Sequence, residues 1–310
     1  MTKLVSVIMS LYKPNELFLA KQLDSINAQD YANIEVVIRN DYPEDINREE
    51  FIREHLTNFP FRYYHGNENL GYVKSFEELV LLAQGEYIAF SDQDDLWLPN
   101  RIGDGILPLI DGSVLSSCDR SIIDQDDKII LASWKESHPN APETNWKTGD
   151  AITQRAAFTC YSIGMATIVK AEVAKAATPF PVDTGHDLWV TLYASEIGTC
   201  AFIDKALVQY RRHGDNITGL FSGISSKNDW YSERIEPRFR VSQEFLKRFP
   251  ASENSKIIND FSQARVNRDR KALRQYRELA PMLVRFEILQ SLVPDSIFKL
   301  LIKAGKRFAE

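Results

Sequence analysis

The sequence predicts an α/β fold with a mixed central sheet and a helical C-terminal region. Three observations support this prediction. Short apolar runs alternate with helical patterns over the first 110 residues, which is typical of parallel strands joined by right-handed crossovers. The next hundred residues contain strand-like runs with fewer helices between them, which indicates strands of mixed direction. Beyond residue 222 the pattern is helical, so we expect a sheet domain at 1–220 and a helical region at 221–310.

The first 110 residues contain four strand-like runs, each followed by a helical pattern. The expected strands cover residues 4–9, 34–39, 61–65 and 86–91. The expected helices cover residues 14–27, 48–58, 72–83 and 98–110. Strand, helix, strand in this order predicts a parallel sheet.

The following segment is less regular. Expected strands cover residues 114–117, 128–131, 164–169, 199–203 and 207–211, and expected helices cover residues 170–177 and 187–197. A polar, tryptophan-bearing stretch at 133–150 interrupts them. A loop of this length is typical of either a disordered excursion or a substrate lid, and both alternatives stay open here.

Composition and charge restrict the class of protein. The chain has 310 residues, 44% hydrophobic and 26% charged, as expected of a soluble globular protein of the size of an enzyme. Its three cysteines, Cys118, Cys160 and Cys200, form no C-x-x-C motif and cannot all pair, which favours a reducing compartment and core positions. We see neither a signal peptide nor a run of 18 apolar residues. We therefore expect a cytoplasmic protein.

The net charge of −6 is distributed unevenly. Residues 265–310 carry eleven Lys or Arg and five Asp or Glu, a balance of +6, which leaves −12 for residues 1–264. An acidic body with a basic tail argues against nucleic-acid binding and for one localised anionic contact.

Polar side chains follow three of the expected parallel strands where each strand ends. Ser10 follows the first strand, Asn40 and Asp41 the second, and Asp92 and Asp94 the fourth. The carboxyl ends of parallel strands meet at one edge of a sheet, where open α/β sheets bind their ligands. We expect a nucleotide at this edge.

Three carboxylates, Asp92, Asp94 and Asp95, lie within four residues at the end of the fourth strand. Like charges this close repel one another unless a cation compensates them. Mg²⁺ or Mn²⁺ suits carboxylate ligands and is usually held together with substrate phosphates. The alternative is a solvated turn in which Asp94 or Asp95 caps the next helix, with Pro99 in its first turn.

Five motifs in order carry a resemblance to a known family. They are Val5-Ser6-Val7-Ile8-Met9-Ser10, Asn40-Asp41, Asn69-Leu70-Gly71, Ser91-Asp92-Gln93-Asp94-Asp95-Leu96-Trp97 and His186-Asp187. Over about residues 4–215 they resemble glycosyltransferase family two, whose inverting enzymes have the GT-A (Rossmann-like) nucleotide-sugar-binding fold. The blocks at 92–97, 185–189 and 210–216 are also similar to bacterial rhamnosyltransferases that build streptococcal rhamnose polysaccharides.

The resemblance implies roles for individual residues. Asp94 would be a metal ligand, with Asp92 on the ribose, the metal or its water, and His213 as a further ligand of Mn²⁺ or Mg²⁺. Asp187 would be the base that takes the acceptor's proton, and its alternative is a helix N-cap. The nucleotide sugar would contact Ser10, Tyr12, Asp41, Asn69, Gly71, Lys74, Asp92, Gln93 and Arg211.

Asp41 departs from the family pattern in its neighbour. The family often has two acids at this strand end, whereas here the first position is Asn40. Asp41 would contact the base or ribose, and the alternative is an Asx turn leading into Pro43.

The resemblance further implies a reaction. The donor would be dTDP-β-L-rhamnose and the acceptor a lipid-linked saccharide of cell-wall polysaccharide synthesis. A UDP-sugar donor and a non-catalytic nucleotide-sugar-binding scaffold are the alternatives. A nucleotidyltransferase is disfavoured because no glycine-rich basic loop follows the first strand.

Residues 295–309 predict a basic amphipathic helix. On a helical wheel of 295–309, one side carries Ile297, Phe298, Leu301, Ile302 and Phe308, and the other carries Lys299, Lys303, Lys306 and Arg307. Such a helix can lie on an anionic membrane surface, here the inner face of the cell membrane, or pack on the protein body or on the second subunit of a homodimer.

Overall fold

The computed structural model describes residues 2–213 and 223–309, except for the side chains of residues 301 and 304–309. The chain forms two compact units, which are described separately. The first comprises Met1–Ala151 and Cys160–Gly214, and the second Ile152–Thr159 and Asp215–Glu310. The predicted boundary at residue 220 lies outside the described residues.

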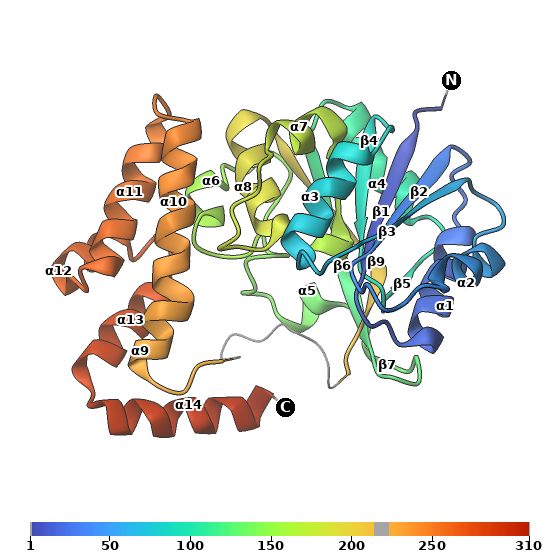
Figure 1. Cartoon of the computed structure of the whole chain (residues 1–310). Helices are drawn as coiled ribbons and strands as arrows, with labels where there is room; N and C mark the ends of the chain where they lie inside the picture. Colours follow the sequence, from blue (N-terminus) through green and yellow to red (C-terminus); the bar gives the residue numbers. More distant parts are fainter. Residues whose placement is uncertain (1, 214–222, 310) are drawn as a thin grey trace. The chain divides into compact units, whose positions relative to one another are not determined.

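A mixed sheet forms the centre of the first unit. The described part of the chain contributes nine strands in the order β3-β2-β1-β4-β8-β6-β9-β5, with β7 paired to β6 (Figure 1). The parallel strands are β1 (Val5–Leu11), β2 (Ile34–Asn40), β3 (Phe61–His65) and β4 (Tyr87–Ser91). The mixed part consists of β5 (Leu96–Trp97), β6 (Leu115–Ile123), β7 (Ile129–Leu131), β8 (Thr167–Lys170) and β9 (Cys200–Arg211). The predicted α/β class with a mixed sheet is confirmed.

Helices cover both faces of this sheet. They are α1 (Glu16–Asn27), α2 (Arg48–His55), α3 (Tyr72–Leu82), α4 (Arg101–Ile110), α5 (Trp134–Ser137), α7 (Ala171–Ala176) and α8 (His186–Ile197), with a 3₁₀ turn at Gly164–Ala166. Leu23 of α1 and Ile106 of α4 belong to the core on one face, together with Val7 of β1. On the other face Phe76 of α3 packs on Phe90 of β4, with ring centroids 5.7 Å apart. Burial on both faces explains why β1, β2 and β4 are almost continuously apolar.

The acidic turn after β4 differs from the expected helix start. Leu96 and Trp97 form the short strand β5, which pairs with Gln209 and Val208 of β9. The N-cap of α4 is Asn100, so the alternative in which Asp94 or Asp95 caps this helix is wrong.

Two further details of the second half of the sheet also differ. The runs at 199–203 and 207–211 form the single strand β9, whose register against β6 shifts next to Asp119. The stretch 133–150 is folded and not a disordered excursion. Trp134 stacks on His138 at 3.6 Å and donates a hydrogen bond to Glu143 over 3.0 Å, and Trp146 is 4% exposed.

The second unit is helical. It contains α6 (Thr153–Ala156), α9 (Lys227–Trp230), a π-helical turn (Tyr231–Ile235), α10 (Glu236–Arg248), α11 (Glu253–Val266), α12 (Arg270–Leu273), a 3₁₀ turn (Arg274–Tyr276), α13 (Pro281–Leu292) and α14 (Asp295–Ala309). A buried ion pair links α11 to α13, with Arg265 Nη2 2.7 Å from Glu287 Oε1. Phe158, which follows α6, packs on Phe261 of α11.

The predicted amphipathic helix is α14. Phe298 and Ile302 lie in the core of the helical unit with Trp230, whereas Ile297 and Leu300 are exposed. Part of the apolar side therefore packs on the rest of the helical unit.

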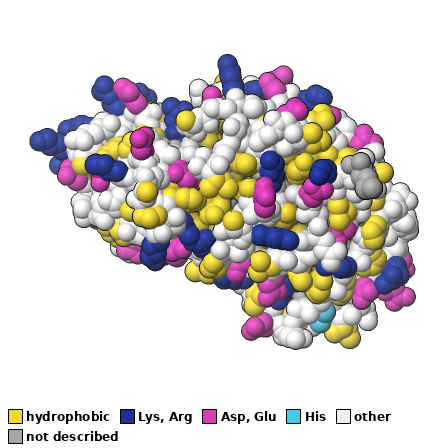
Figure 2. All heavy atoms as spheres, turned by 90° about the horizontal axis from the view of Figure 1, so that it is seen from above, with side chains coloured by type: hydrophobic (Ala, Val, Ile, Leu, Met, Phe, Trp, Pro, Cys, Tyr) yellow, Lys and Arg dark blue, Asp and Glu magenta, His cyan; other side chains and the backbone are white. Residues whose placement is uncertain are grey.

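None of the helices in the described ranges is both long enough and apolar enough to cross a bilayer. Basic and acidic side chains are interspersed on the face seen in Figure 2.

Candidate active site

The carboxyl ends of β1, β2 and β4 lie side by side, because β1 is the centre of this triplet. The N–H of Asp41, directly after β2, donates to the Leu11 carbonyl at the end of β1 over 2.7 Å. On the other side, Gln22 of α1 donates a hydrogen bond to Ser91 at the end of β4 over 2.8 Å. The three polar strand ends predicted from the sequence therefore share one edge.

Gln93 joins the exits of β4 and β1. Its side-chain amide accepts a hydrogen bond from the Tyr12 N–H at 3.0 Å and donates one to the Tyr12 carbonyl at 3.2 Å. The Tyr12 ring is 44% exposed and meets Tyr42 edge-on, with centroids 5.8 Å apart. Lys13 Nζ lies over both rings, at 5.4 and 5.0 Å. This edge thus carries an aromatic surface on which a flat ring can stack.

Asp41 fastens the end of β2 to the turn that precedes α3. Its side chain is almost fully buried and is paired with the guanidinium of Arg39. Its two oxygens also accept hydrogen bonds from the N–H groups of Leu70 and Gly71, at 2.9 and 2.8 Å. Each oxygen therefore already has a partner within the protein.

The Asx turn at this strand end belongs to Asn40 rather than to Asp41. Asn40 Oδ1 accepts a hydrogen bond from the Tyr42 N–H at 3.1 Å. Its amide donates to the Tyr63 hydroxyl over 3.0 Å. The resemblance leads us to expect an acid at position 40. The amide found there instead forms hydrogen bonds that stabilise the end of β2.

Three other predicted residues have simple surroundings. Ser10 is half-buried near the end of β1. Asn69 is exposed and accepts a hydrogen bond from the Gly71 N–H at 2.9 Å, where Gly71 has the positive φ of 77° that glycine allows. Lys74, in the first turn of α3, forms an ion pair with Glu77 at 2.9 Å.

Asp92, Asp94 and Asp187 form a cluster of like charge. The pKa of Asp92 is raised to about 7, because burial disfavours its charged form and because the charges of Asp94 and Asp187 lie close to it. The cluster brings together two segments about ninety residues apart in the sequence, the acidic turn and the start of α8. An added cation would stabilise it.

Asp94 and His213 are the residues best placed to hold that cation. Asp94 Oδ2 and His213 Nε2 are 3.0 Å apart. Within residues 2–213 and 223–309, no three His, Cys, Asp or Glu side chains converge closely enough to hold a metal ion by themselves. A carboxylate and an imidazole, completed by phosphate oxygens, fit a divalent ion that the protein shares with a nucleotide.

Asp95 and Arg211 are buried below the acidic turn. Asp95 is fully buried, and its Oδ1 accepts a hydrogen bond from the Arg211 N–H at 3.0 Å. Burial, followed by the charges of Asp94 and Asp92, raises the pKa of Asp95 well above its ordinary value. The Arg211 side chain is also fully buried, and its Nε donates to the Asp94 carbonyl over 2.8 Å.

Asp187 lies in the first turn of α8. Its Oδ2 accepts a hydrogen bond from the Gly164 N–H at 3.2 Å, and its Oδ1 accepts one from the Leu188 N–H at 2.8 Å. The N-cap of this helix is Gly185, so the alternative in which Asp187 is the N-cap is wrong. The carboxylate is half-exposed and is held on two sides by backbone.

Gly164 is a site residue that the sequence does not single out, whereas its neighbour His186 belongs to a motif that carries the resemblance. His186 is 5% exposed and stacks on Phe76 with centroids 3.9 Å apart, and neither ring nitrogen has a hydrogen-bond partner. Burial lowers its pKa to about 4, although the charge of Asp187 opposes this shift. A Cβ on Gly164 would lie 3.0 Å from His186 Nε2. Gly164 directly precedes the apolar run at 165–169, and a glycine at the start of a strand often marks a place where another group approaches the backbone closely. This pattern could have predicted the contact.

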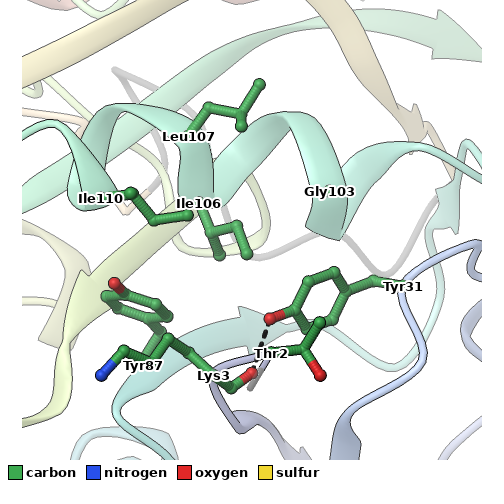
Figure 3. A pocket seen from close by; sticks show the side chains of 8 residues that line it. All are labelled: Thr2, Lys3, Tyr31, Tyr87, Gly103, Ile106, Leu107 and Ile110. Carbon is green, nitrogen blue, oxygen red and sulfur yellow. Dashed lines mark hydrogen bonds between the residues drawn. The ribbon is translucent and has the colours of Figure 1, made fainter.

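A hollow of about 600 Å³ lies at the opposite, amino-terminal edge of the strands (Figure 3). Tyr31, Tyr87 and Ile106 line it, and the Tyr31 hydroxyl donates to the Lys3 carbonyl over 2.6 Å. None of the predicted site residues belongs to its lining.

The mixed sheet with helices on both faces, and the polar strand ends gathered at one edge, define a fold of the GT-A class. Residues 6–166 match the model of "Glycosyl transferase family 2". The chain belongs to glycosyl transferase family 2.

Two relatives illustrate how far the sequence similarity extends. An uncharacterized glycosyltransferase of Methanocaldococcus jannaschii is 36% identical over 100 residues, 32% of this chain and 34% of that protein. The match thus spans about a third of that relative's length. An uncharacterized glycosyltransferase of Nostoc sp. is 25% identical over 256 residues, 79% of this chain and 76% of that protein.

Two solved structures share the fold. S. aureus TarS 1–349 in complex with UDP-GlcNAc superposes with a TM-score of 0.61 at 15% identity, over 99% of this chain and 92% of that one. The mannosyltransferase PcManGT from Pyrobaculum calidifontis, in complex with GDP-Man and Mn²⁺, has a TM-score of 0.59 at 16% identity, over 98% and 85%. These likenesses concern the fold alone.

Proposed function

We propose that this protein is an inverting, metal-dependent glycosyltransferase that transfers a sugar from a nucleoside diphosphate to a saccharide acceptor. The cluster of Asp92, Asp94 and Asp187 at the carboxyl edge of the parallel strands is the observation that carries this proposal. A cluster of like charge that raises the pKa of Asp92 to about 7 suits a site completed by a cation and a diphosphate.

The donor would bind along the strand ends. Tyr12 and Tyr42 offer an aromatic surface for the base, next to Ser10. The turn that carries Asn69 and Gly71 opens α3, where a helix N-terminus favours an anion. We assign Asp41 the task of holding this turn in place, because Leu70 and Gly71 donate to its carboxylate.

Asp94 and His213 would hold Mn²⁺ or Mg²⁺ against the diphosphate, with Asp92 beside them on the ribose or on metal-bound water. When bound, such an ion offsets the negative charge that grows on the departing phosphate. Lys74 lies in the first turn of α3 and could add positive charge to the diphosphate only by leaving its ion pair with Glu77.

Asp187 would remove the proton from the acceptor hydroxyl. As that oxygen bonds to the anomeric carbon, the bond from this carbon to the β-phosphate oxygen breaks on the opposite face, which inverts the configuration. The hydrogen bonds from Gly164 and Leu188 hold the carboxylate in place, and general-base catalysis of this kind typically contributes on the order of 10²–10⁴ in rate.

We further propose dTDP-β-L-rhamnose as the donor and a lipid-linked saccharide of cell-wall polysaccharide synthesis as the acceptor. This choice is supported by the resemblance of residues 92–97, 185–189 and 210–213 to rhamnosyltransferases; residues 214–216 of that block lie outside the described structure. A UDP-sugar donor and a non-catalytic binding scaffold are the competing functions. The exposed Ile297, Leu300 and Lys303 of α14 are compatible with work at the inner membrane surface or with a homodimer contact.

A thermal-shift series followed by a turnover assay tests the proposal. A ligand that binds only the folded state stabilises it by about 2.7 kcal/mol at 100 times its Kd. We expect dTDP to raise Tm more than UDP or GDP, and only when Mn²⁺ is present. We then expect release of dTDP from dTDP-rhamnose in the presence of a rhamnosylated lipid acceptor. A larger shift with UDP would reassign the donor, and binding without any turnover over the acceptor panel would favour the scaffold.

A further inference from the structure

Arg211 connects the acidic turn to the hairpin between β6 and β7. Its Nε donates to the Asp94 carbonyl over 2.8 Å, and its Nη1 donates to the Asp124 carbonyl over 3.1 Å. Nη1 also pairs with the carboxylate of Asp127. Because the guanidinium is fully buried, its charge depends on these partners.

Asp127 is the charged partner at the tip of that hairpin. Its second oxygen pairs with Lys21 of α1, so the carboxylate lies between two cations. Burial alone would raise its pKa, but Lys21 and Arg211 lower it below its ordinary value. Residue 127 has a φ of 65°, which glycine or asparagine would adopt at least as readily as aspartate. The backbone alone gives no reason for a carboxylate here.

Arg211 affects the site through the acidic turn, residues 92–95, with which it forms two hydrogen bonds. Arg211 fixes the carbonyl of Asp94 with its side chain and the carboxylate of Asp95 with its own N–H. Two residues further on, His213 meets Asp94 at 3.0 Å. The position of Asp94 relative to His213 therefore depends on how Arg211 is held.

We infer that Asp127 is a positioning residue for the cation site at Asp94 and His213, and that it acts through Arg211. This inference rests on the proposed function, because it concerns the same site. It predicts that the charge of Asp127, at the far end of a hairpin, controls how tightly the protein binds a divalent ion.

Asp127→Asn is the variant that tests the inference. Asparagine keeps the shape of the side chain and tolerates the positive φ, but it removes the charge facing Arg211. Asp126→Asn is the matched control. Asp126 lies in the same turn and is exposed, and its substitution removes one negative charge, as Asp127→Asn does. The full-length proteins are compared by electron paramagnetic resonance titration of free Mn²⁺ in the presence of dTDP. Amide hydrogen exchange of residues 92–97 and Tm are measured in parallel.

We expect Asp127→Asn to weaken Mn²⁺ binding by about 10-fold or more, the effect typical of residues that orient a metal ligand. Exchange at residues 92–97 should become faster, and Tm should fall below that of the Asp126→Asn control, because the buried Arg211 loses its carboxylate partner. Mn²⁺ binding is therefore compared at a temperature at which both variants are folded. Arg211→Lys should weaken Mn²⁺ binding more strongly. Lysine has a single side-chain nitrogen and cannot replace both the Nε donor to Asp94 and the Nη1 donor to Asp124 and Asp127.

Equal Mn²⁺ affinity in Asp127→Asn and Asp126→Asn would overturn the inference and leave the proposed function intact. A wild-type protein that binds no Mn²⁺ with dTDP would instead remove the proposed cation site. Exchange of 92–97 separates the two failures, since unchanged exchange in Asp127→Asn shows that Asp127 does not hold the turn.

Discussion

The backbone N–H of Gly164 donates to the carboxylate of Asp187 over 3.2 Å, which joins the turn before β8 to the first turn of α8. The acceptor of this hydrogen bond is the proposed catalytic base, and the donor is a glycine, which contributes only its backbone N–H. Together with the hydrogen bond from the Leu188 N–H to Oδ1, it fixes both oxygens of the carboxylate.

Replacing Asp187 with Asn should abolish turnover and spare donor binding. The change removes the group that accepts the proton, so we expect kcat to fall by about 10²–10⁴-fold while the dTDP affinity changes little. Release of dTDP and calorimetric titration measure the two quantities. Glu172→Gln is the control, because Glu172 is an exposed acid on the neighbouring helix α7. Turnover in Asp187→Asn equal to that of the control would remove Asp187 as the base.

Replacing Gly164 with Ala should lower kcat with little change in stability. The new Cβ would lie 3.0 Å from His186 Nε2, so His186 must shift by a few tenths of an ångström, whereas the 4.0 Å to the Asp187 Cβ is an ordinary contact. We expect the shift of His186 to displace Asp187, its neighbour in the first turn of α8. Since misplacing a reacting group by 1 Å can cost about 10²-fold, we expect a loss of roughly 10-fold. Gly103→Ala in α4 is a control glycine substitution away from Asp187. An unchanged kcat would show that the position of Asp187 does not depend on this close contact.

Asp92 should make the stability of the ligand-free protein depend on pH. Its pKa is 3.8 in a free side chain and about 7 in the fold, so the folded state holds the extra proton between these values. Stability must therefore fall as pH rises from about 4 to about 7, and level off above that. His186, whose pKa is lowered to about 4, contributes with the opposite sign between that value and 6.5.

The difference between wild type and Asp92→Asn removes the contribution of His186, which is present in both proteins. We expect Asp92→Asn to gain stability over wild type as the pH is raised towards 7, in urea denaturation measured without metal or nucleotide. A difference that stays constant between pH 4 and 8 would contradict the raised pKa of Asp92. With Mn²⁺ and dTDP added, the wild type should regain its stability at pH 7.

Replacing Asp41 with Asn should destabilise the protein as well as weaken nucleotide binding. The substitution leaves the buried Arg39 guanidinium without one of its charged partners, and removing one member of a buried pair typically costs about 3–5 kcal/mol. Glu78 also pairs with Arg39, at 2.7 Å, so we expect a loss at the lower end of that range. Urea denaturation gives the free energy of unfolding. The exposed Glu44→Gln is the matched charge control, and a loss no larger than in that variant would contradict the role of Asp41 in holding the turn.

The fold could be predicted where the sequence pattern is local. Val5–Leu11, Ile34–Asn40 and Tyr87–Ser91 are apolar because both their faces are covered, and their polar ends fall at one edge by the rules of parallel topology. Leu96 and Trp97 gave no such sign, because a two-residue strand exists only through its pairing with β9, more than a hundred residues away.

The partners of the polar residues could not be predicted in the same way. Arg211, beside Arg212 and His213, has the sequence context of a phosphate contact, whereas the structure buries it against Asp94, Asp124 and Asp127. Asp41 likewise has the context of a base contact, but Arg39 and the turn before α3 take up its oxygens. Which carboxylate faces a ligand and which faces an arginine depends on contacts between distant segments.

The membership of residues 152–159 in the helical unit, through Phe158 and Phe261, limits how this protein can be shortened. The chain enters the helical unit once in mid-sequence and again after residue 214, so the unit is not an appendage that a single cut removes. A fragment ending at residue 220 would keep Phe158 and lose the aromatic ring that covers it. Grafting the sheet unit onto another protein would therefore require residues 152–159 to be redesigned, because Phe158 would otherwise lose its cover. Gly164, which holds Asp187, follows five residues later in the sequence, so the redesign could also change activity.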